Sequence, residues 1–375
     1  MDSDIILQKY IRNNLNYWKE KSWDEKKLIE IIKKYNLRIA KLEIKNGNVK
    51  ILDKCKKTKI KLNKTIDFLK DVSKEYLNLD TIIFINTSDT LNYENTNIYN
   101  INGDKTTKKI KKFVWGVAED NNYINIVDSE PIEEYNSSYP VFCFERDRRM
   151  HGILFPTFGA DNKDFKNSIN IDKFNFDDKE IEIPIFRGKN ICCDINYLDK
   201  IDLINYSYLN NQDTNFKFCS KGKHPIWDKF MVSKPHLKFF QNINKIDPSI
   251  NIDDFINYFS SDNFEDLDYL LNHKYIITVG SAKNRKWYLS NSCILEYKFK
   301  NKEYFHEDIF EDMKDIIYFN LDNLKDRLKQ LKKNNYELSK KIIKNRKIKF
   351  NKYLDYHNLV NWYGKFLLEY QKLKV

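Results

Sequence analysis

In the stretch IEIPIFRGKN, residues 181–190, an apolar run is followed by a charged arginine and then by a glycine, whose backbone is flexible. Arg187 and Gly188 follow directly on Pro184-Ile185-Phe186, in a chain that has only nine glycines. Taken alone, the pattern predicts a buried strand followed by a turn, with the arginine solvated. The alternative is a phosphate-binding site, because arginine makes bidentate contacts with phosphate and glycine lets the backbone approach it closely. The surrounding sequence has to decide between the two.

Length and composition limit the classes of protein to which the chain can belong. A length of 375 residues suggests two or three domains of roughly 150 residues each. Apolar residues make up 41% of the chain and aromatic residues 15%, which is enough for extensive cores. Charged residues at 32% and a mean hydropathy of -0.68 indicate a soluble protein. No run approaches the ~18 consecutive apolar residues of a membrane helix, and the first residues lack a signal-peptide pattern. We therefore expect a cytoplasmic protein without a membrane span.

The cysteines and the net charge are less informative. None of the six cysteines shows the C-x-x-C spacing of a zinc site, and the adjacent Cys192-Cys193 are poor partners for one disulfide. Reduced thiols in the cytosol are the simplest interpretation. The net charge of +11 allows nucleic acid or another polyanion as a partner. Because Asn, Lys and Ile, which AT-rich coding favours, are abundant, part of this charge can reflect composition alone.

The hydrophobic pattern predicts an α/β fold. Residues 4–36 read as two amphipathic helices, and the alternation around Asn46-Gly47 predicts a hairpin. The continuous apolar run at 79–87 is typical of a strand buried on both faces. Residues 160–182 are polar and weakly patterned, which indicates a linker. Beyond them strands and helices alternate, as in parallel α/β sheets, before the chain becomes helical from Leu321 onward.

Three of the predicted strands end in polar or glycine-containing segments. Asp89 follows IIFINTS, Arg187 and Gly188 follow IPIF, and GSAKNR, residues 280–285, follows YIITV. In open α/β sheets, ligands bind outside the carboxyl ends of the strands. A loop of small residues lets backbone N–H groups reach a phosphate, and a nearby arginine adds charge. Each signal is weak by itself, since GSAKNR is neither a Walker loop nor G-x-G-x-x-G.

Together and in this order, the segments resemble glycosyltransferase family 90, which contains the protein O-glucosyltransferases and the fungal capsule-associated xylosyltransferases. The resemblance runs from about Leu37 to the C-terminus, and the shared order carries most of its specificity. The segments that carry it are LDTIIFINTSD (79–89), YPVFCFERDRRMHGILFPTFG (139–159), IPIFRGKN (183–190), HKYIITVGSAKNRKWYLSNSCILEY (273–297), NKEYFHED (301–308) and VNWYGKFLLEY (360–370).

The resemblance implies a GT-B fold, in which two Rossmann-like domains face each other across a cleft. It divides the chain into N-terminal helices (1–36), an acceptor-side domain (37–170), a nucleotide-sugar-binding domain (171–345) and a C-terminal helix (346–375). It also implies transfer of a sugar, glucose or xylose, from a UDP-sugar with inversion of configuration. The acceptor would be a hydroxyl of a protein, a glycan or a lipid-linked sugar. No cofactor and no metal are expected, and nucleic acid is not the expected partner.

By the same resemblance, Asp89 is the general base that takes the proton from the acceptor hydroxyl. Arg187 and Arg285 would hold the diphosphate and stabilise the charge that develops on the leaving group. Glu303 would contact a hydroxyl of the sugar nucleotide. The complete set expected to bind the donor is Arg187, Gly188, Lys189, Gly280, Ser281, Ala282, Lys283, Asn284, Arg285 and Glu303.

The chain departs from the family pattern at several of these positions. Lys189-Asn190 stands where relatives often have Ser-Arg, and Leu91 where they often have proline. Lys283 and Asn284 occupy positions that are usually small. The signal peptide and paired cysteines of the secretory relatives are missing, which fits a virus-encoded or otherwise cytosolic member, in the host-cell cytoplasm if viral. These departures leave the donor sugar open and allow a scaffold that has lost activity.

Other interpretations stay open from sequence alone. Asp89 could simply cap a helix after its strand. Asp266-Leu267-Asp268 mimics the Asp-x-Asp motif of metal-dependent transferases but precedes its strand, which favours an exposed helix face. His306 could contact a ribose or a sugar, or lie on the surface. From another functional class, the basic charge and many aromatic residues keep a nucleic-acid-binding protein as the alternative.

Overall fold

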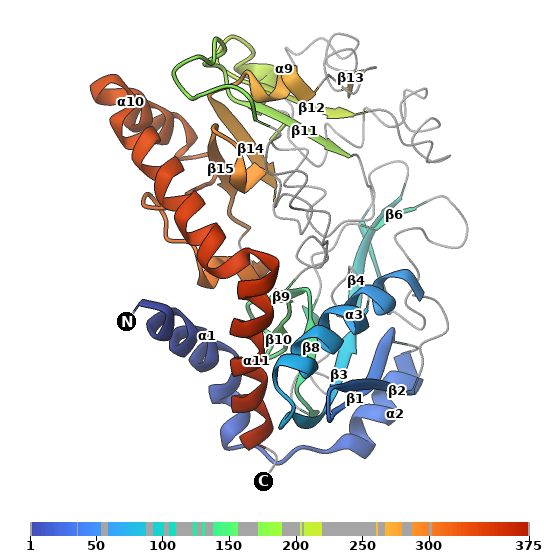
Figure 1. Ribbon diagram of the computed structural model, residues 1–375. Helices are drawn as coiled ribbons and strands as arrows, with labels where there is room; N and C mark the ends of the chain where they lie inside the picture. Colours follow the sequence, from blue (N-terminus) through green and yellow to red (C-terminus); the bar gives the residue numbers. More distant parts are fainter. Residues whose placement is uncertain are drawn as a thin grey trace.

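A computed structural model gives the architecture (Figure 1). It describes residues 2–35, 37–53, 59–87, 93–100, 105–109, 123–125, 130–131, 138–156, 172–189, 203–204, 206–219, 260–261, 267–279, 287–299 and 302–373. Two sheets lie in separate parts of the molecule, and a pair of long C-terminal helices runs from one to the other. The α/β class and the helical additions at both ends are confirmed. The predicted boundaries at 36, 170 and 345 stay predictions.

The N-terminal sheet has the strand order β10-β8-β3-β1-β2. Its strands are β1 (Ile39–Lys45), β2 (Asn48–Asp53), β3 (Asp80–Asn86), β8 (Val141–Cys143) and β10 (Ile153–Leu154). Strand β3 lies in the middle, parallel to β8 and antiparallel to β1, and six of its seven residues are at least half-buried. This confirms the strand predicted to be covered on both faces.

Helices cover both faces of this sheet. On one face, α1 (Asp2–Lys19), α3 (Lys59–Glu75) and α11 (Tyr356–Lys372) share one apolar core with it. On the other, α2 (Glu25–Tyr35) packs Leu28 and Ile31 against Phe84 and Val141. The predicted hairpin is also confirmed, because Asn46 and Gly47 join β1 to β2 with φ values of 51° and 76°. Two successive positive φ angles are what a two-residue hairpin turn requires.

The parallel sheet has the order β13-β12-β11-β14-β15-β17, and all its described pairs are parallel. The strands are β11 (Ile185–Lys189), β12 (Asn215–Cys219), β13 (Ser260–Ser261), β14 (Tyr275–Val279), β15 (Cys293–Tyr297) and β17 (Ile317–Phe319). Numbered from β11, this is the 3-2-1-4-5-6 order of a doubly wound Rossmann sheet. The chain therefore reverses its direction of winding between the neighbouring strands β11 and β14.

The remaining elements connect and cover the sheets. Strand β9 (Glu145–Asp147) pairs antiparallel with β16 (Lys302–Tyr304), and we call this pair the bridging ribbon because its strands come from the two halves of the chain. A short 3-10 turn, η3 (Phe305–Asp308), follows β16, and α9 (Leu267–Leu271) precedes β14. A small antiparallel sheet consists of β4 (Tyr93–Asn100), β5 (Lys105–Lys109), β6 (Tyr123–Asn125) and β7 (Glu130–Pro131).

The C-terminal helices link the two halves. Helix α10 (Leu324–Lys349) packs on the parallel sheet, is interrupted at residues 333–336, and continues through the π-helical turn η4 (Phe350–Leu354) into α11. In Figure 1 these segments run from the parallel sheet down to the N-terminal sheet, where α11 lies beside α1. The last residues of the chain thus complete the core of its first half.

Residues 172–182, the described part of the predicted linker, form turns and irregular chain that pack against the parallel sheet, and the linker itself stays a prediction. Lys179 is 2% exposed and donates to both carboxylate oxygens of Asp172, at 3.2 and 3.0 Å. Phe176 is buried in the core of the parallel sheet. A polar pattern was a poor guide here because the polar groups satisfy each other away from water.

Helix α11 makes a close approach that depends on a glycine. A Cβ built on Gly364 would lie 2.3 Å from two ring carbons of Tyr76, whose hydroxyl donates to the backbone oxygen of Asn361 at 2.9 Å. For Gly364→Ala we expect an overpacking cost of roughly 1–3 kcal/mol, against a gain of about 1 kcal/mol in helix propensity.

The net result should be a fall in the free energy of unfolding by about 1 kcal/mol, measured by urea denaturation. Lys365→Ala, at the exposed neighbouring position, is the control and should be close to neutral. An increase in stability for Gly364→Ala would contradict the contact with Tyr76.

Candidate functional site

The winding reversal in the parallel sheet marks the candidate site. Strands β11 and β14 are parallel neighbours that end at Lys189 and Val279. In doubly wound sheets, a reversal of the strand order opens a crevice at the carboxyl ends of the two strands concerned. The two segments predicted to bind phosphate, 187–189 and 280–285, are thereby assigned to adjacent strands.

Several of the predicted site residues lie outside the described residues. Asp89 comes three positions after the end of β3, and Gly280, Ser281, Ala282, Lys283, Asn284 and Arg285 come directly after β14. Their roles stay predictions. The backbone of Gly188 and Lys189 is described, and these two residues close β11 opposite Phe218 and Cys219.

Arg187 points away from the carboxyl edge. Its Nη1 donates to the backbone oxygens of Phe186 and Asn215 at 2.9 and 2.8 Å, and its Nη2 donates to Asn215 Oδ1 at 3.0 Å. Asn215 opens β12 and pairs with Ile185, so it lies toward the amino ends of the strands. A contact between Arg187 and a nucleotide at the carboxyl edge would require the guanidinium to leave Asn215.

Glu303 forms a buried ion pair in the structure, and its predicted contact with the sugar nucleotide stays a prediction. Arg146 Nε and Nη2 donate to Glu303 Oε2 at 3.1 and 2.8 Å, and Arg148 Nη1 lies 3.4 Å from Oε1. Arg146 also donates through Nη1 to Asn14 Oδ1 and to the backbone oxygen of Gly152. The Glu303 carboxylate therefore lies at the centre of the bridging ribbon and holds the two halves of the chain together.

The ion pair with Glu303 determines the protonation state of Arg146. Burial by itself would lower the pKa of Arg146, whose side chain is 8% exposed. The charge and hydrogen bonds of Glu303 outweigh burial, so that the pKa is raised and the guanidinium stays charged. A buried ion pair with such complete hydrogen bonding is costly to break from one side.

A second buried cluster lies near the carboxyl ends of β14 and β15. The Glu296 carboxylate accepts from the Tyr288 hydroxyl at 2.6 Å and from Thr278 Oγ1 at 3.5 Å, and its Oε1 lies 2.5 Å from His306 Nε2. Thr278 and Tyr288 come just before and just after residues 280–286, so one carboxylate joins both flanks of the predicted phosphate loop. A glutamate inside the apolar run CILEY was the signal that could have revealed it.

The charges in this cluster follow from burial and proximity. Burial would lower the pKa of His306, but the charge of Glu296 and the hydrogen bond to it outweigh this, and the pKa is raised. Burial, followed by the nearby charge of Glu296, raises the pKa of Tyr288 well above its usual value, so its hydroxyl stays protonated. The result is a hydrogen-bonded histidine–glutamate pair with a neutral tyrosine as third partner.

The segment that leads out of the predicted loop is held rigidly. Arg346 of α10 is fully buried and donates to the backbone oxygens of Tyr288, Ser290 and Ser292 at 2.8, 2.7 and 2.9 Å. Burial lowers the pKa of Arg346 to about 10, which still leaves it charged at neutral pH. Asp172 accepts from the Asn291 backbone N–H at 2.6 Å. This network could not be predicted from the sequence, since its members come from three distant segments.

Among the described residues, no group of three or more His, Cys, Asp or Glu side chains is placed to hold a metal ion. Within the same part of the chain, no helix combines the length and the apolar character needed to cross a bilayer.

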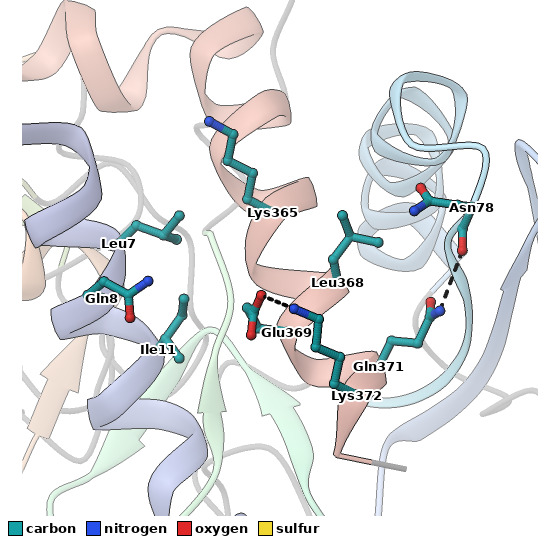
Figure 2. A pocket seen from close by; sticks show the side chains of 9 residues that line it. All are labelled: Leu7, Gln8, Ile11, Asn78, Lys365, Leu368, Glu369, Gln371 and Lys372. Carbon is teal, nitrogen blue, oxygen red and sulfur yellow. Dashed lines mark hydrogen bonds and ion pairs between the residues drawn. The ribbon is translucent and has the colours of Figure 1, made fainter. Parts of the chain in front are cut away.

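A pocket of about 480 Å³ lies elsewhere, between α1 and α11 (Figure 2). Leu7, Ile11 and Leu368 form its apolar wall, and Lys372 is paired with Glu369 at 2.6 Å at its rim. Its lining comes from α1, α11 and the turn before β3, and includes no residue of the parallel sheet. It is therefore separate from the carboxyl-edge site.

Comparison with known proteins gives only faint likenesses. No protein-family model and no curated protein matches the sequence. Among solved structures, TarM is 12% identical with a TM-score of 0.32, covering 61% of this chain and 50% of TarM. A glycosyltransferase from Rickettsia africae is 12% identical with a TM-score of 0.34, covering 55% of this chain and 54% of that one.

A third likeness is to the C-terminal domain of a glycosyl transferase group 1 family protein, LpcC, from Francisella tularensis. It is 11% identical with a TM-score of 0.28, covering 51% of this chain and 92% of that domain. The chain spans about half the length of the first two structures. Likenesses this weak carry no argument, so the fold rests on the described strand order and the function on the residues of the site.

Proposed function

We propose that the chain is a glycosyltransferase of the family 90 kind. It would move glucose or xylose from a UDP-sugar to a hydroxyl acceptor with inversion and without a metal ion. The observation that carries the proposal is the winding reversal between β11 and β14. Nucleotides bind at such a reversal in doubly wound sheets, and the two segments that resemble the donor-binding motifs of the family leave from these two strands.

In this proposal Asp89 removes the proton of the acceptor hydroxyl while that oxygen attacks the anomeric carbon, and the UDP group leaves with the electron pair of the broken bond. Arg285, with Arg187 after its side chain has left Asn215, would stabilise the charge that develops on the diphosphate. Backbone N–H groups of Gly280, Ser281 and Ala282 would add donors. Lys189, Lys283 and Asn284 would line the same site, whereas Glu303, committed to Arg146, is left out.

Binding of UDP without metal tests the proposal most directly. Millimolar UDP in the presence of EDTA should raise the melting temperature by several degrees, because a ligand that binds only the folded state stabilises it. The shift with UDP is compared with the shift that RNA produces at the same ionic strength. The ionic strength must be the same because any basic protein binds RNA weakly at low salt. A large shift with RNA and none with UDP would favour a nucleic-acid-binding protein. UDP binding without transfer to any acceptor would favour an inactive scaffold.

The role of Arg187 can be separated from its structural bonds. Arg187→Ala should weaken UDP binding about tenfold or more, as expected for loss of a charge-assisted hydrogen bond to phosphate. Asn215→Ala is the matched control, because it removes the side-chain acceptor of Nη2 and keeps the guanidinium itself. Calorimetric titration with UDP measures both variants. If Arg187→Ala bound UDP as tightly as the unchanged chain, the assignment of Arg187 to the diphosphate would be wrong.

A further inference from the structure

We propose that the pocket between α1 and α11 is a docking site for an amphipathic helix of a partner protein, apolar on one face and acidic along its edges. The inference concerns binding and goes beyond the proposed transfer of a sugar. Asn78, which lines the pocket, precedes the amino end of β3, a strand of seven residues that spans about 23 Å. The pocket therefore lies at the end of this strand opposite to the one from which the segment with Asp89 leaves.

The pocket is a preformed groove with an apolar floor (Figure 2). Leu7 and Ile11 of α1 are only 6% and 7% exposed and belong to the core against which Leu368 of α11 packs. Gln371 Oε1 accepts from the backbone N–H of Asp80 at 2.7 Å, which ties the start of β3 to α11. A groove between two packed helices accepts the side-chain ridge of a third helix, and fixed walls lower the entropic cost of binding.

Exposed apolar side chains lie next to two parts of the lining. Ile5 precedes the lining residue Gln8 by one turn of α1, and Leu77 directly precedes Asn78 in the turn before β3. Each of the two is 66% exposed, the highest value among the large hydrophobic residues that the structure describes. Exposed apolar groups beside a polar rim are typical of a surface that binds another protein.

The charge of this surface favours an acidic partner. The parts of α1 and α11 that line the groove, residues 7–12 and 365–372, contain four basic residues and one acidic residue, a net charge of +3. The residues are Lys9, Arg12, Lys365, Lys372 and Glu369. Lys9 and Lys372 have acidic partners within the chain. Arg12 and Lys365 are exposed, and no ion pair of either is found in the described part of the chain. Acidic residues of a partner helix would pair with these two cations.

Other occupants fit this surface less well. In a symmetric dimer the same surface of a second copy would face it, so that Arg12 and Lys365 would lie near like charges. A bilayer is flat and cannot fill a concave pocket of about 480 Å³. Single-stranded nucleic acid is held by aromatic side chains on which its bases stack, and none of the nine lining residues is aromatic.

Fluorescence anisotropy with designed peptides tests the proposal on the full chain. The probe is a labelled helix of about five turns, with leucines at positions i, i+3, i+4 and i+7 and glutamates beside them. A second peptide has lysine in place of each glutamate, and a third has the composition of the first in scrambled order. The acidic helix should bind with a micromolar Kd, about tenfold more tightly than the other two, because it alone matches both the groove and its charge.

Single substitutions locate the binding surface. Lys365→Glu and Arg12→Glu should each weaken binding of the acidic helix about fivefold, as expected for reversal of an exposed charge. Ile5→Gln should weaken it about fivefold through loss of apolar contact. Lys344→Glu, at an exposed position of α10, makes the same change of charge away from the groove and should bind like the unchanged protein.

Equal affinities of Lys365→Glu and Lys344→Glu would overturn the inference, as would absence of binding by the acidic helix up to millimolar concentration. Binding to vesicles of phosphatidylcholine and phosphatidylglycerol that Lys365→Glu abolishes would contradict it in favour of a membrane. A dimer that the same variant dissociates would contradict it in favour of a second copy. UDP takes no part in these measurements, so the inference and the proposed function can fail separately.

Discussion

Arg146→Met should lower the free energy of unfolding by about 3 kcal/mol, because it removes one partner of a buried ion pair and leaves Glu303 with the longer, more exposed contact to Arg148. Glu303 Oε2 would lose both of its hydrogen bonds from Arg146, and Asn14 Oδ1 and the Gly152 carbonyl would each lose a donor. Methionine preserves much of the volume of the side chain, so the loss reports on polar contacts rather than on a cavity.

The matched control is Arg148, two positions after Arg146 in the sequence. Arg148 also contacts Glu303, but its side chain is 33% exposed against 8% for Arg146. Arg148→Met should therefore cost at most about 1 kcal/mol, as for partly exposed ion pairs. Urea denaturation of both variants measures the difference. Equal costs for the two would show that the Arg146–Glu303 pair does not hold the halves together.

Asp89→Asn should reduce the rate of sugar transfer by about 10²–10⁴, the usual contribution of a general base. An amide has nearly the shape of a carboxylate but cannot accept the proton of the acceptor hydroxyl. The affinity for UDP should remain unchanged, because in the proposed mechanism the base contacts the acceptor and not the nucleotide. The effect should therefore appear in kcat and not in donor binding.

Transfer by this variant is followed by release of UDP from UDP-glucose and UDP-xylose, with a panel of hydroxyl acceptors scored by mass. Asp266→Asn is the control, since Asp266 belongs to the Asp-x-Asp sequence that we interpret as surface. Full activity of Asp89→Asn would remove Asp89 from the mechanism. Loss of UDP binding together with transfer would mean that Asp89 supports the fold or the donor site instead.

Local structure was predictable where a short pattern has one physical solution. Asn46-Gly47 between alternating residues allows a two-residue hairpin, and the structure contains it. Alternation of strands and helices after residue 182 predicted a parallel sheet, which is also found. The burial of the segment at 172–182 was not predictable, because its polar composition hides pairs such as Lys179–Asp172, which close only when the chain folds.

The candidate site, too, was predictable only in part from the sequence. The sequence identified the strand ends that carry Arg187, Gly188 and residues 280–285 but could not tell which strands are neighbours. It noted His306 without a partner, because Glu296 lies ten residues away on another element. It could not show that Arg146, 157 positions before Glu303, donates to the Glu303 carboxylate.

What the sequence determined by itself is the kind and order of the elements, since helix and strand periodicities and turn residues are local properties of the chain. The tertiary structure alone decided that β11 and β14 lie side by side and that Arg146 meets Glu303. It also decided that Glu296 joins Thr278, Tyr288 and His306. These contacts join different elements of the fold, and their free energy arises only when burial removes water from both partners at once.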